Sequence, residues 1–253
     1  MRVIDAVAGT GVVLIAGQAV SFWAEHYAAR DRLPELGGLH LRFPEQGQAL
    51  WVSRDIDFLG GREEARLCAE ELPGELVVQS AHAVFEGAPP SHVGIVVFDD
   101  TRGERRKVDF MDDLYGLSAA DRAELGERAV PLTREGRTTL VVDPISQLKS
   151  RLANATTLGD RKGTPRALRQ CQIAIWVARE WVLETLEVEG WSTLRNQLVK
   201  ARVVPLAKTR LWRWARDKYA LDPFECLRPL LIDPRVPQRD RARWLPSLEE
   251  RYG

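Results

Sequence analysis

The hydrophobic pattern of this sequence changes at Asp143-Pro144, and this change constrains the fold more than any other feature. Before it, short apolar runs alternate with glycine, proline and charged segments, a pattern typical of strands mixed with helices. After it, apolar residues recur at spacings of three and four, as they do between Leu168 and Val182, which indicates helices. The sequence therefore predicts an α+β first domain over residues 1–143 and a helical C-terminal domain over residues 144–253.

The two parts also differ in charge. The whole chain of 253 residues has a formal net charge of zero, which argues neither for nor against a nucleic-acid partner. Residues 1–150 nevertheless carry about −8 and residues 151–253 about +8. The first half is thus suited to holding cations and the second to holding phosphates.

The cysteines and the apolar N-terminal run bear on where the protein works. Cys68, Cys171 and Cys226 are odd in number, far apart and in no C-x-x-C pair, so we expect reduced, mostly buried thiols in a cytoplasmic protein. Residues 6–24 lack charge, as a membrane span does, but glycines and polar residues interrupt the run. We therefore expect no membrane role.

A short strand near the N-terminus leads into a possible anion site. The sequence predicts a helix over residues 2–8, a buried strand over 12–16, and a helix over 19–29 with Val20, Trp23 and Ala24 on its inner side. The turn between them, Gly17-Gln18, would present unpaired backbone N–H groups and the positive end of a helix to an anion. The alternative is a plain tight turn.

Two carboxylates share one face of a second predicted strand. Asp55 and Asp57 lie within residues 50–59, a run whose aromatic and β-branched content favours a strand. Successive strand side chains point to opposite faces, so both aspartates project on one side while Ile56 and Phe58 project on the other. Adjacent carboxylates repel each other unless a cation lies between them, and Mg²⁺ is the hard ion that prefers such oxygens.

A third carboxylate lies within a later apolar strand. Residues 92–98 and 105–111 are predicted to form a hairpin, with Asp99 and Asp100 in its turn. Asp109 lies between Val108 and Phe110, where a charge is costly unless it is paired or binds a metal. Asp112 and Asp113, just beyond the strand, are the rival positions.

The remaining predicted elements complete the two domains. A charged helix over 62–72 follows Gly60-Gly61, Ser118 caps a further helix, and strands within 129–142 flank a turn at Glu135-Gly136. Helices are then predicted over 144–155, 165–186, 190–200 and 206–220, followed by short helical pieces.

Taken together, a strand, the Gly17-Gln18 turn, a helix, the Asp55/Asp57 pair and the later Asp109 resemble the DNA polymerase β-like nucleotidyltransferase superfamily. Within it, the chain resembles the bacterial nucleotidyltransferases related to abortive-infection and toxin–antitoxin systems. The resemblance implies a palm domain, a mixed sheet with flanking helices. It also implies that residues 143–154 correspond to the family's helix after the palm, where a lysine, here Lys149, faces the nucleotide.

The resemblance implies a metal-dependent transferase. Asp55 and Asp57 would bind two Mg²⁺ ions, with Mn²⁺ as an alternative, and Asp109 would bind the catalytic ion and take the acceptor's proton. Gly17 and Gln18 would hold the phosphates of an NTP, with Arg54 or Lys149 neutralising them.

A nucleoside monophosphate would pass to RNA (tRNA) or a protein, and the enzyme would be a toxin with a cognate antitoxin. The alternative is an inactive palm that senses nucleotides or binds a partner, because Gln18 replaces the family's usual Ser or Gly and its Lys-Asp-x-x-Asp element has no copy here.

The basic, tryptophan-bearing run from Lys208 to Tyr219 allows two interpretations. It would suit an RNA groove, because basic side chains meet phosphates and aromatic rings stack on bases. The favoured interpretation is an amphipathic helix with Leu211, Trp214 and Ala215 facing inward.

Overall fold

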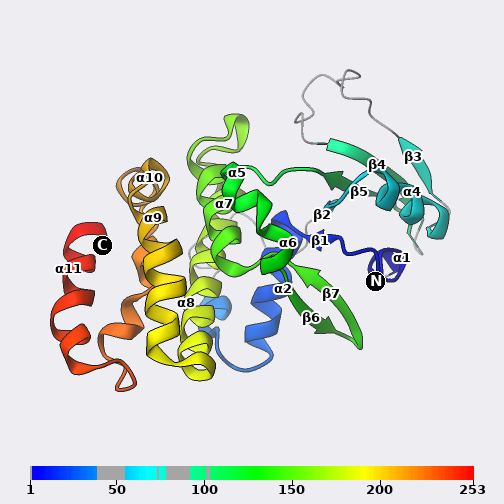
Figure 1. Cartoon of the computed structure of the whole chain (residues 1–253). Helices are drawn as coiled ribbons and strands as arrows, with labels where there is room; N and C mark the ends of the chain where they lie inside the picture. The colour runs from blue at the N-terminus through cyan, green and yellow to red at the C-terminus, as the bar shows by residue number, and fades with distance from the viewer. Residues whose placement is uncertain (1, 39–54, 73, 78–91, 101–102) are drawn as a thin grey trace. The chain divides into compact units, whose positions relative to one another are not determined.

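The computed structural model describes residues 2–38, 55–72, 74–77, 92–100 and 103–253 (Figure 1). The chain forms two compact units, one of Met1–Phe22 with Ala49–Asp143 and one of Trp23–Gln48 with Pro144–Gly253. Asp143 and Pro144 fall in different units. The second unit also takes in Trp23–Gln48, which the sequence placed in the first domain.

The first unit is built on a mixed sheet of seven described strands, in the order β3-β4-β5-β2-β1-β7-β6. Neighbouring strands are antiparallel except for β2 with β5 and β1 with β7, which are parallel. The strands are β1 (Val13–Leu14), β2 (Asp55–Leu59), β3 (Glu75–Val77), β4 (His92–Asp99), β5 (Arg105–Met111), β6 (Val130–Arg134) and β7 (Arg137–Val141).

These strands confirm the predicted ones, apart from β3, which the sequence did not predict. At the predicted β6–β7 turn, Glu135 and Gly136 both have positive φ, as a two-residue hairpin turn requires. The expected excursion over 30–48 and the first half of the predicted strand over 50–59 fall partly in residues 39–54, outside the described residues.

Short helices accompany the sheet. α4 packs on β4 and β5 through its buried Ala65, Cys68 and Ala69, while its other face is charged. Ser118 caps α5 in a reciprocal capping box with Asp121, as predicted. The helices are α1 (Arg2–Ala6), α4 (Arg62–Glu71), α5 (Ala119–Ala123) and α6 (Leu125–Arg128).

The second unit is helical, which confirms an α+β chain with a helical C-terminal region. Its long helices α7 and α8 pack side by side, and α10 packs on α7 and α9 (Figure 1). Its elements are η1 (Pro34–Gly38), α7 (Pro144–Thr156), η3 (Gly159–Arg161), α8 (Pro165–Thr193), the π-helix η4 (Leu194–Val203), α9 (Val204–Ala207), α10 (Arg210–Tyr219), η5 (Pro223–Cys226), η6 (Arg228–Leu231), the π-helix η7 (Asp240–Trp244) and α11 (Leu245–Tyr252).

The helix predicted to begin at Gly190 is instead the continuation of α8. Gly190 has φ of 79° and ψ of 171°, so α8 kinks there without ending. Only glycine adopts such a backbone conformation without strain, because it has no Cβ. The segment predicted as the rest of that helix is the π-helix η4.

The predicted inward face of α10 was right for Ala215 and wrong for Trp214. Trp212, not Trp214, is fully buried, and its indole Nε1 donates to the backbone oxygen of Tyr252 at 2.8 Å. Ala215 is buried as predicted, while Trp214 is half-buried beneath the ammonium of Lys218, 4.7 Å from the ring centroid.

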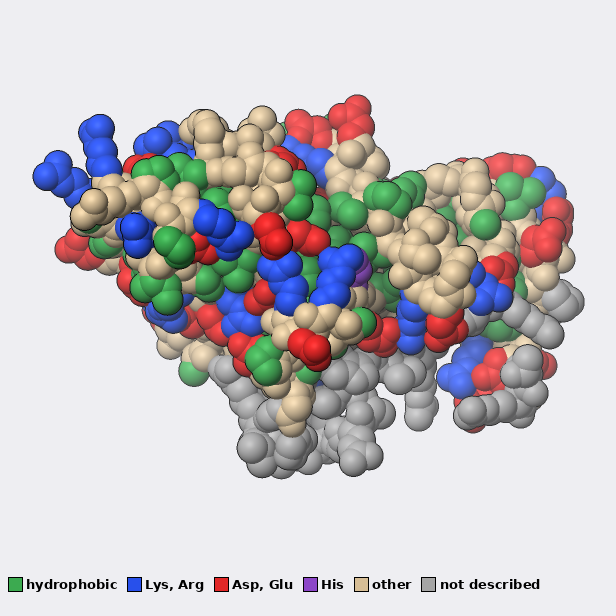
Figure 2. All heavy atoms as spheres, turned by 90° about the horizontal axis from the view of Figure 1, so that it is seen from below, with side chains coloured by type: hydrophobic (Ala, Val, Ile, Leu, Met, Phe, Trp, Pro, Cys, Tyr) green, Lys and Arg blue, Asp and Glu red, His purple; other side chains and the backbone are tan. Residues whose placement is uncertain are grey.

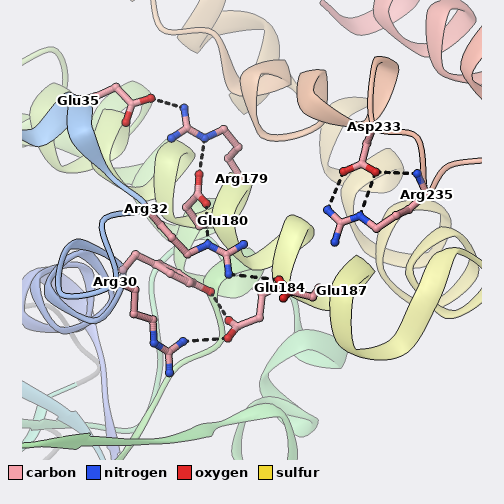
Figure 3. A network of polar contacts seen from close by, with 10 residues as sticks. Arg30, Arg32, Glu35, Arg179, Glu180, Glu184, Glu187, Asp233 and Arg235 are labelled. Atoms are coloured by element: carbon pink, nitrogen blue, oxygen red, sulfur yellow. Dashed lines mark hydrogen bonds and ion pairs between the residues drawn. The ribbon is translucent and has the colours of Figure 1, made fainter.

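A network of charges joins the segment after α2 (Ala16–Ala28) to α8 within the helical unit (Figure 3). Arg179 donates to Glu180 at 2.7 Å and to Glu35 at 2.5 Å. Arg32 donates to the same Glu180 at 3.2 Å, and Arg30 to Glu184 at 3.0 Å. The carboxylate of Glu180 is thereby held between two guanidinium groups.

The structure confirms that the three cysteines are buried thiols. Cys68, Cys171 and Cys226 are buried and free, and burial raises the pKa of the Cys68 and Cys171 thiols to about 12. Among the described residues, no helix is both long enough and apolar enough to cross a membrane.

Candidate functional site

The structure pairs two of the three predicted carboxylates across neighbouring strands. β2 and β5 are parallel, and their register sets Asp57 directly beside Asp109. Residues in register on adjacent strands project from the same face of a sheet. Phe58 and Phe110, the next pair in register, are both fully buried with ring centroids 5.8 Å apart. Their apolar packing on the opposite face fixes the register that brings the aspartates together.

Asp109 is a buried carboxylate with a cation beside it. The residue is 4% exposed, and its Oδ2 lies 2.8 Å from the Nζ of Lys107. Lys107 lies two positions earlier on the same strand, so both side chains project from one face. His92 on β4 approaches the same oxygen, with its Nε2 at 3.7 Å. The lysine offsets part of the cost of burying this charge.

The second oxygen of Asp109 remains without a donor. Oδ1 is buried and has no hydrogen-bond partner among the described residues. A carboxylate oxygen can only accept, and leaving it unsatisfied in the interior is costly. An oxygen of this kind fits a hard cation such as Mg²⁺, which binds to proteins through one or two carboxylates and keeps its other positions for water and phosphate.

The start of α2 (Ala16–Ala28) lies next to this pair. β1 runs beside β2, and the backbone N–H of Ile15 donates to the carbonyl oxygen of Asp57 at 2.9 Å. Gly17, which is buried, and Gln18, which is half-buried, are in the first turn of α2. The first turn of an α-helix has backbone N–H groups without acceptors inside the helix, and this end of the helix is positive.

The turn into α2 is made by a different residue from the expected one. The sequence placed Gly17-Gln18 before the helix as its turn, whereas both residues lie inside the helix. Ala16 makes the turn instead, with a left-handed φ of 56°. An alanine rarely takes this conformation, which costs about 1 kcal/mol or more, and no local sequence signal indicates it.

The other predicted site residues, Asp55, Arg54 and Lys149, cannot be compared with Asp57 and Asp109 in the same way. The register sets Asp55 beside Lys107, but the Asp55 side chain is outside what the structure describes, as is all of Arg54. Lys149 is half-buried on α7 and belongs to the helical unit. The geometry within the sheet unit therefore concerns Asp57, Asp109 and the backbone of Asp55.

The rival acidic residues have other surroundings. Asp113 accepts from Arg122 at 2.7 Å, and Asp112 is exposed. Asp100 accepts from the backbone of Glu104 at 3.0 Å and from Arg106 at 2.8 Å, so it is a turn residue as predicted. None of the three is in register with Asp57.

The sequence did not single out Lys107 and His92 as neighbours of Asp109. Lys107 could have been identified, because residues two apart on a strand share a face. His92 could not, because its approach depends on the pairing of β4 with β5 and on a bulge between His92 and Gly94. Among the described side chains, which do not include that of Asp55, no three His, Cys, Asp or Glu residues are grouped to hold a metal ion.

Comparison with known proteins gives no family. No protein-family model and no curated protein matches the sequence. The crystal structure of JHP933 from Helicobacter pylori matches over 98% of this chain and 94% of that one, with 12% identity and a TM-score of 0.39. A likeness of this degree carries no information about activity.

Proposed function

We propose that this protein is a Mg²⁺-dependent nucleotidyltransferase whose sheet unit is the palm. The observation that supports this most is the pairing of Asp57 with Asp109 in register on adjacent parallel strands, where no described residue donates to one buried oxygen of Asp109. Neighbouring carboxylates can hold the Mg²⁺ ions that assist phosphoryl transfer, and the start of a helix can hold phosphates. The resemblance seen in the sequence supports the same reaction class.

The roles of the residues follow from their chemistry. Asp55 and Asp57 would bind both ions, and Asp109 one of them; when bound, Mg²⁺ neutralises the charge that develops on the transferring phosphoryl group. Asp109 would also take the proton of the acceptor hydroxyl. The oxygen of that hydroxyl would attack the α-phosphorus of the NTP, and pyrophosphate would leave. Gly17 and Gln18 would hold the outer phosphates of the NTP through the first turn of α2, with Arg54 or Lys149 as counter-charges.

The biological setting rests on the resemblance. We infer an RNA acceptor, such as tRNA, or a protein acceptor, and a role as the toxin of a defence or toxin–antitoxin system with a cognate antitoxin. Three buried, free thiols suit a cytoplasmic protein.

Incubation with each α-³²P-labelled NTP, Mg²⁺ and total RNA tests the proposal. Labelled RNA is the expected product, and label on protein would change the acceptor but keep the reaction. Asp57→Asn and Asp109→Asn should each lower the rate by about 100-fold or more, because each removes a charge that the transition state needs. Asp99→Asn, at an exposed position at the end of β4, is the matched control and should leave the rate unchanged.

Equal labelling by the wild type and Asp57→Asn would refute the proposed site. Loss of labelling in Asp99→Asn as well would show that the Asn variants act through folding. Circular dichroism of each variant separates these two outcomes.

A second candidate is a palm that binds nucleotides without turnover. This candidate is favoured by the position of Lys107. Its ammonium lies 2.8 Å from the Oδ2 of Asp109, where a metal ion would bind in the enzyme. An ammonium there would neutralise the carboxylate without supplying a Lewis acid. Nucleotide binding by calorimetry, with no label transferred to RNA or protein, would support this candidate over the enzyme.

A further inference from the structure

Arg169, near the start of α8, is a buried cation, and the described residues supply no partner to two of its three guanidinium nitrogens. The residue is only 6% exposed, and its Nε and Nη1 have no hydrogen-bond partner among the described residues. No described carboxylate forms an ion pair with it. A guanidinium in this state bears most of the cost of leaving water and regains little of it.

Its position along α8 adds to this cost. α8 begins at Pro165 with Thr164 as its cap, and its first turn contains no acidic residue. The first turns of a helix carry a positive partial charge, so cations there are disfavoured and anions are favoured. Arg166 and Arg169 both lie in these turns. Burial lowers the pKa of Arg169, and the charge of Arg166 lowers it further.

A second buried arginine reaches the same part of the helical unit. Arg151 on α7 is 5% exposed, and its Nη1 donates to the Oε1 of Gln170, at 3.1 Å, the residue that follows Arg169. Its charge also acts on the thiol of Cys171, one position further along α8. Arg151 therefore reaches the turn of α8 that carries Arg169.

The face of α7 that carries Arg151 is polar although it is buried. Gln147, Ser150, Arg151 and Asn154 lie on one side of this helix, where the α-helical repeat places residues three and four apart. A buried helix face normally carries apolar residues, as the opposite side of α7 does with Leu148 and Leu152. Polar side chains kept in the interior are usually matched to a polar ligand or to one another.

We propose that Arg169, with Arg151, binds a phosphate group in the helical unit. Arginine suits this ligand because its planar fork donates two parallel hydrogen bonds to an oxyanion. Both arginines belong to the helical unit, whereas Asp57 and Asp109 belong to the sheet unit, and binding through the arginines needs no divalent metal. The phosphate would come from a nucleotide or from free inorganic phosphate, and the same titration distinguishes the two sources.

The full chain in EDTA and phosphate-free buffer is titrated with inorganic phosphate, pyrophosphate and ATP, and followed by thermal unfolding and calorimetry. At saturation, phosphate or pyrophosphate should raise the Tm of the wild type by about 5 °C. ATP binding more tightly than pyrophosphate would assign the site to nucleotides, and equal affinity would assign it to free phosphate. EDTA excludes phosphate binding through metal ions. The Tm of Asp57→Asn should respond to phosphate as that of the wild type does. Loss of the phosphate site is therefore distinguishable from failure of the proposed transferase.

Arg169→Met should lose most of the response to phosphate, and its Tm without phosphate should equal or exceed that of the wild type, because an uncompensated buried charge is removed. Arg169→Lys keeps the charge without the fork and should bind at least tenfold more weakly than the wild type. Arg243→Met, at an exposed position on η7, is the control and should behave as the wild type. A wild type that does not respond to any of the three probes, or an Arg169→Met variant that is destabilised but responds fully, would overturn the proposal.

Discussion

Asp109 is a buried carboxylate with few partners, and its charge is compensated mainly by Lys107. The carboxylate is 6% exposed, while the side chain of Lys107, two positions earlier on β5, is 40% exposed. An ion pair between exposed groups contributes little to stability, but removing the cation from a buried carboxylate leaves a charge that is poorly compensated.

Lys107→Met should therefore lower the free energy of unfolding in EDTA by about 1–3 kcal/mol. Adding Mg²⁺ should restore more stability to this variant than to the wild type, because the ion replaces the lost positive charge. Urea unfolding with and without Mg²⁺ measures both effects. Lys162→Met, at an exposed lysine, is the control, and a variant as stable as the wild type in EDTA would contradict this role for Lys107.

His26 on α2 gives the protein a pH dependence. Burial lowers the pKa of this imidazole below its ordinary value of 6.5, and the charge of Arg30 lowers it further. As the pH falls below about 6.5, the unfolded chain takes up the proton before the folded protein does, so stability decreases. Urea unfolding at pH 7.5 and 5.5 should show this loss, and His26→Gln should reduce the difference between the two values. An unchanged difference would assign the pH dependence to other groups.

At the scale of elements, the kink in α8 depends on one glycine. A Cβ at Gly190 would meet no atom within 4 Å, so any effect of substitution comes from the backbone, whose φ is 79°. Gly190→Ala should lower the free energy of unfolding by about 1–2 kcal/mol, because alanine adopts this conformation only with strain. Gly126→Ala is the matched control in α6, where a Cβ also meets nothing within 4 Å and φ is not positive. Equal losses of stability for the two substitutions in urea unfolding would show that the kink does not require glycine at position 190.

Elements with local signals could be predicted, and features that depend on distant residues could not. The hairpin of β4 with β5, the turn at Glu135-Gly136 and the Ser118 cap are each encoded by a few neighbouring residues. The turn at Ala16 is set by the pairing of β1 with both β2 and β7, and the sequence therefore misplaced it. Trp212 faces inward because Thr209 caps α10 and because Tyr252, 40 residues away, accepts its indole N–H.

The candidate site shows the same division. Three separated carboxylates and their strands could be chosen from the sequence, because a charge within an apolar strand is conspicuous. The register that sets Asp57 beside Asp109 could not, since it depends on the packing of Phe58 against Phe110 across two strands that are about 50 residues apart. Arg169 was not noticed as a buried cation, because burial of a single arginine in a helix leaves no local pattern.

At the scale of the whole molecule, the two halves of the sequence differ in net charge, about −8 for residues 1–150 and about +8 for residues 151–253. Basic and acidic side chains are interspersed over the face drawn in Figure 2. Within the helical unit, many arginines lie against glutamate or aspartate, and the segment from Tyr27 to Glu35 is bound to α8 in this way (Figure 3). Part of the positive charge of residues 151–253 is thus neutralised by acidic side chains of the same unit.

Arg179 contributes most to this attachment, because it is 13% exposed and joins Glu35 to Glu180. Arg179→Met should lower the free energy of unfolding by about 3 kcal/mol, because the buried Glu180 loses one of its two cations. Arg235→Met breaks an exposed pair with Asp233 seen in the same view and should cost about 1 kcal/mol or less. Calorimetry of the two variants tests this ranking, and similar losses would contradict it.

The central claim is that Asp57 and Asp109 together bind a divalent cation. The most direct test is a crystal structure of the full chain with Mn²⁺ and a non-hydrolysable NTP, measured for anomalous scattering. We expect an anomalous peak within about 2.5 Å of a carboxylate oxygen of both Asp57 and Asp109, with the phosphates beside the first turn of α2. Bound nucleotide with no peak at these carboxylates, and with Lys107 still paired to Asp109, would contradict the claim.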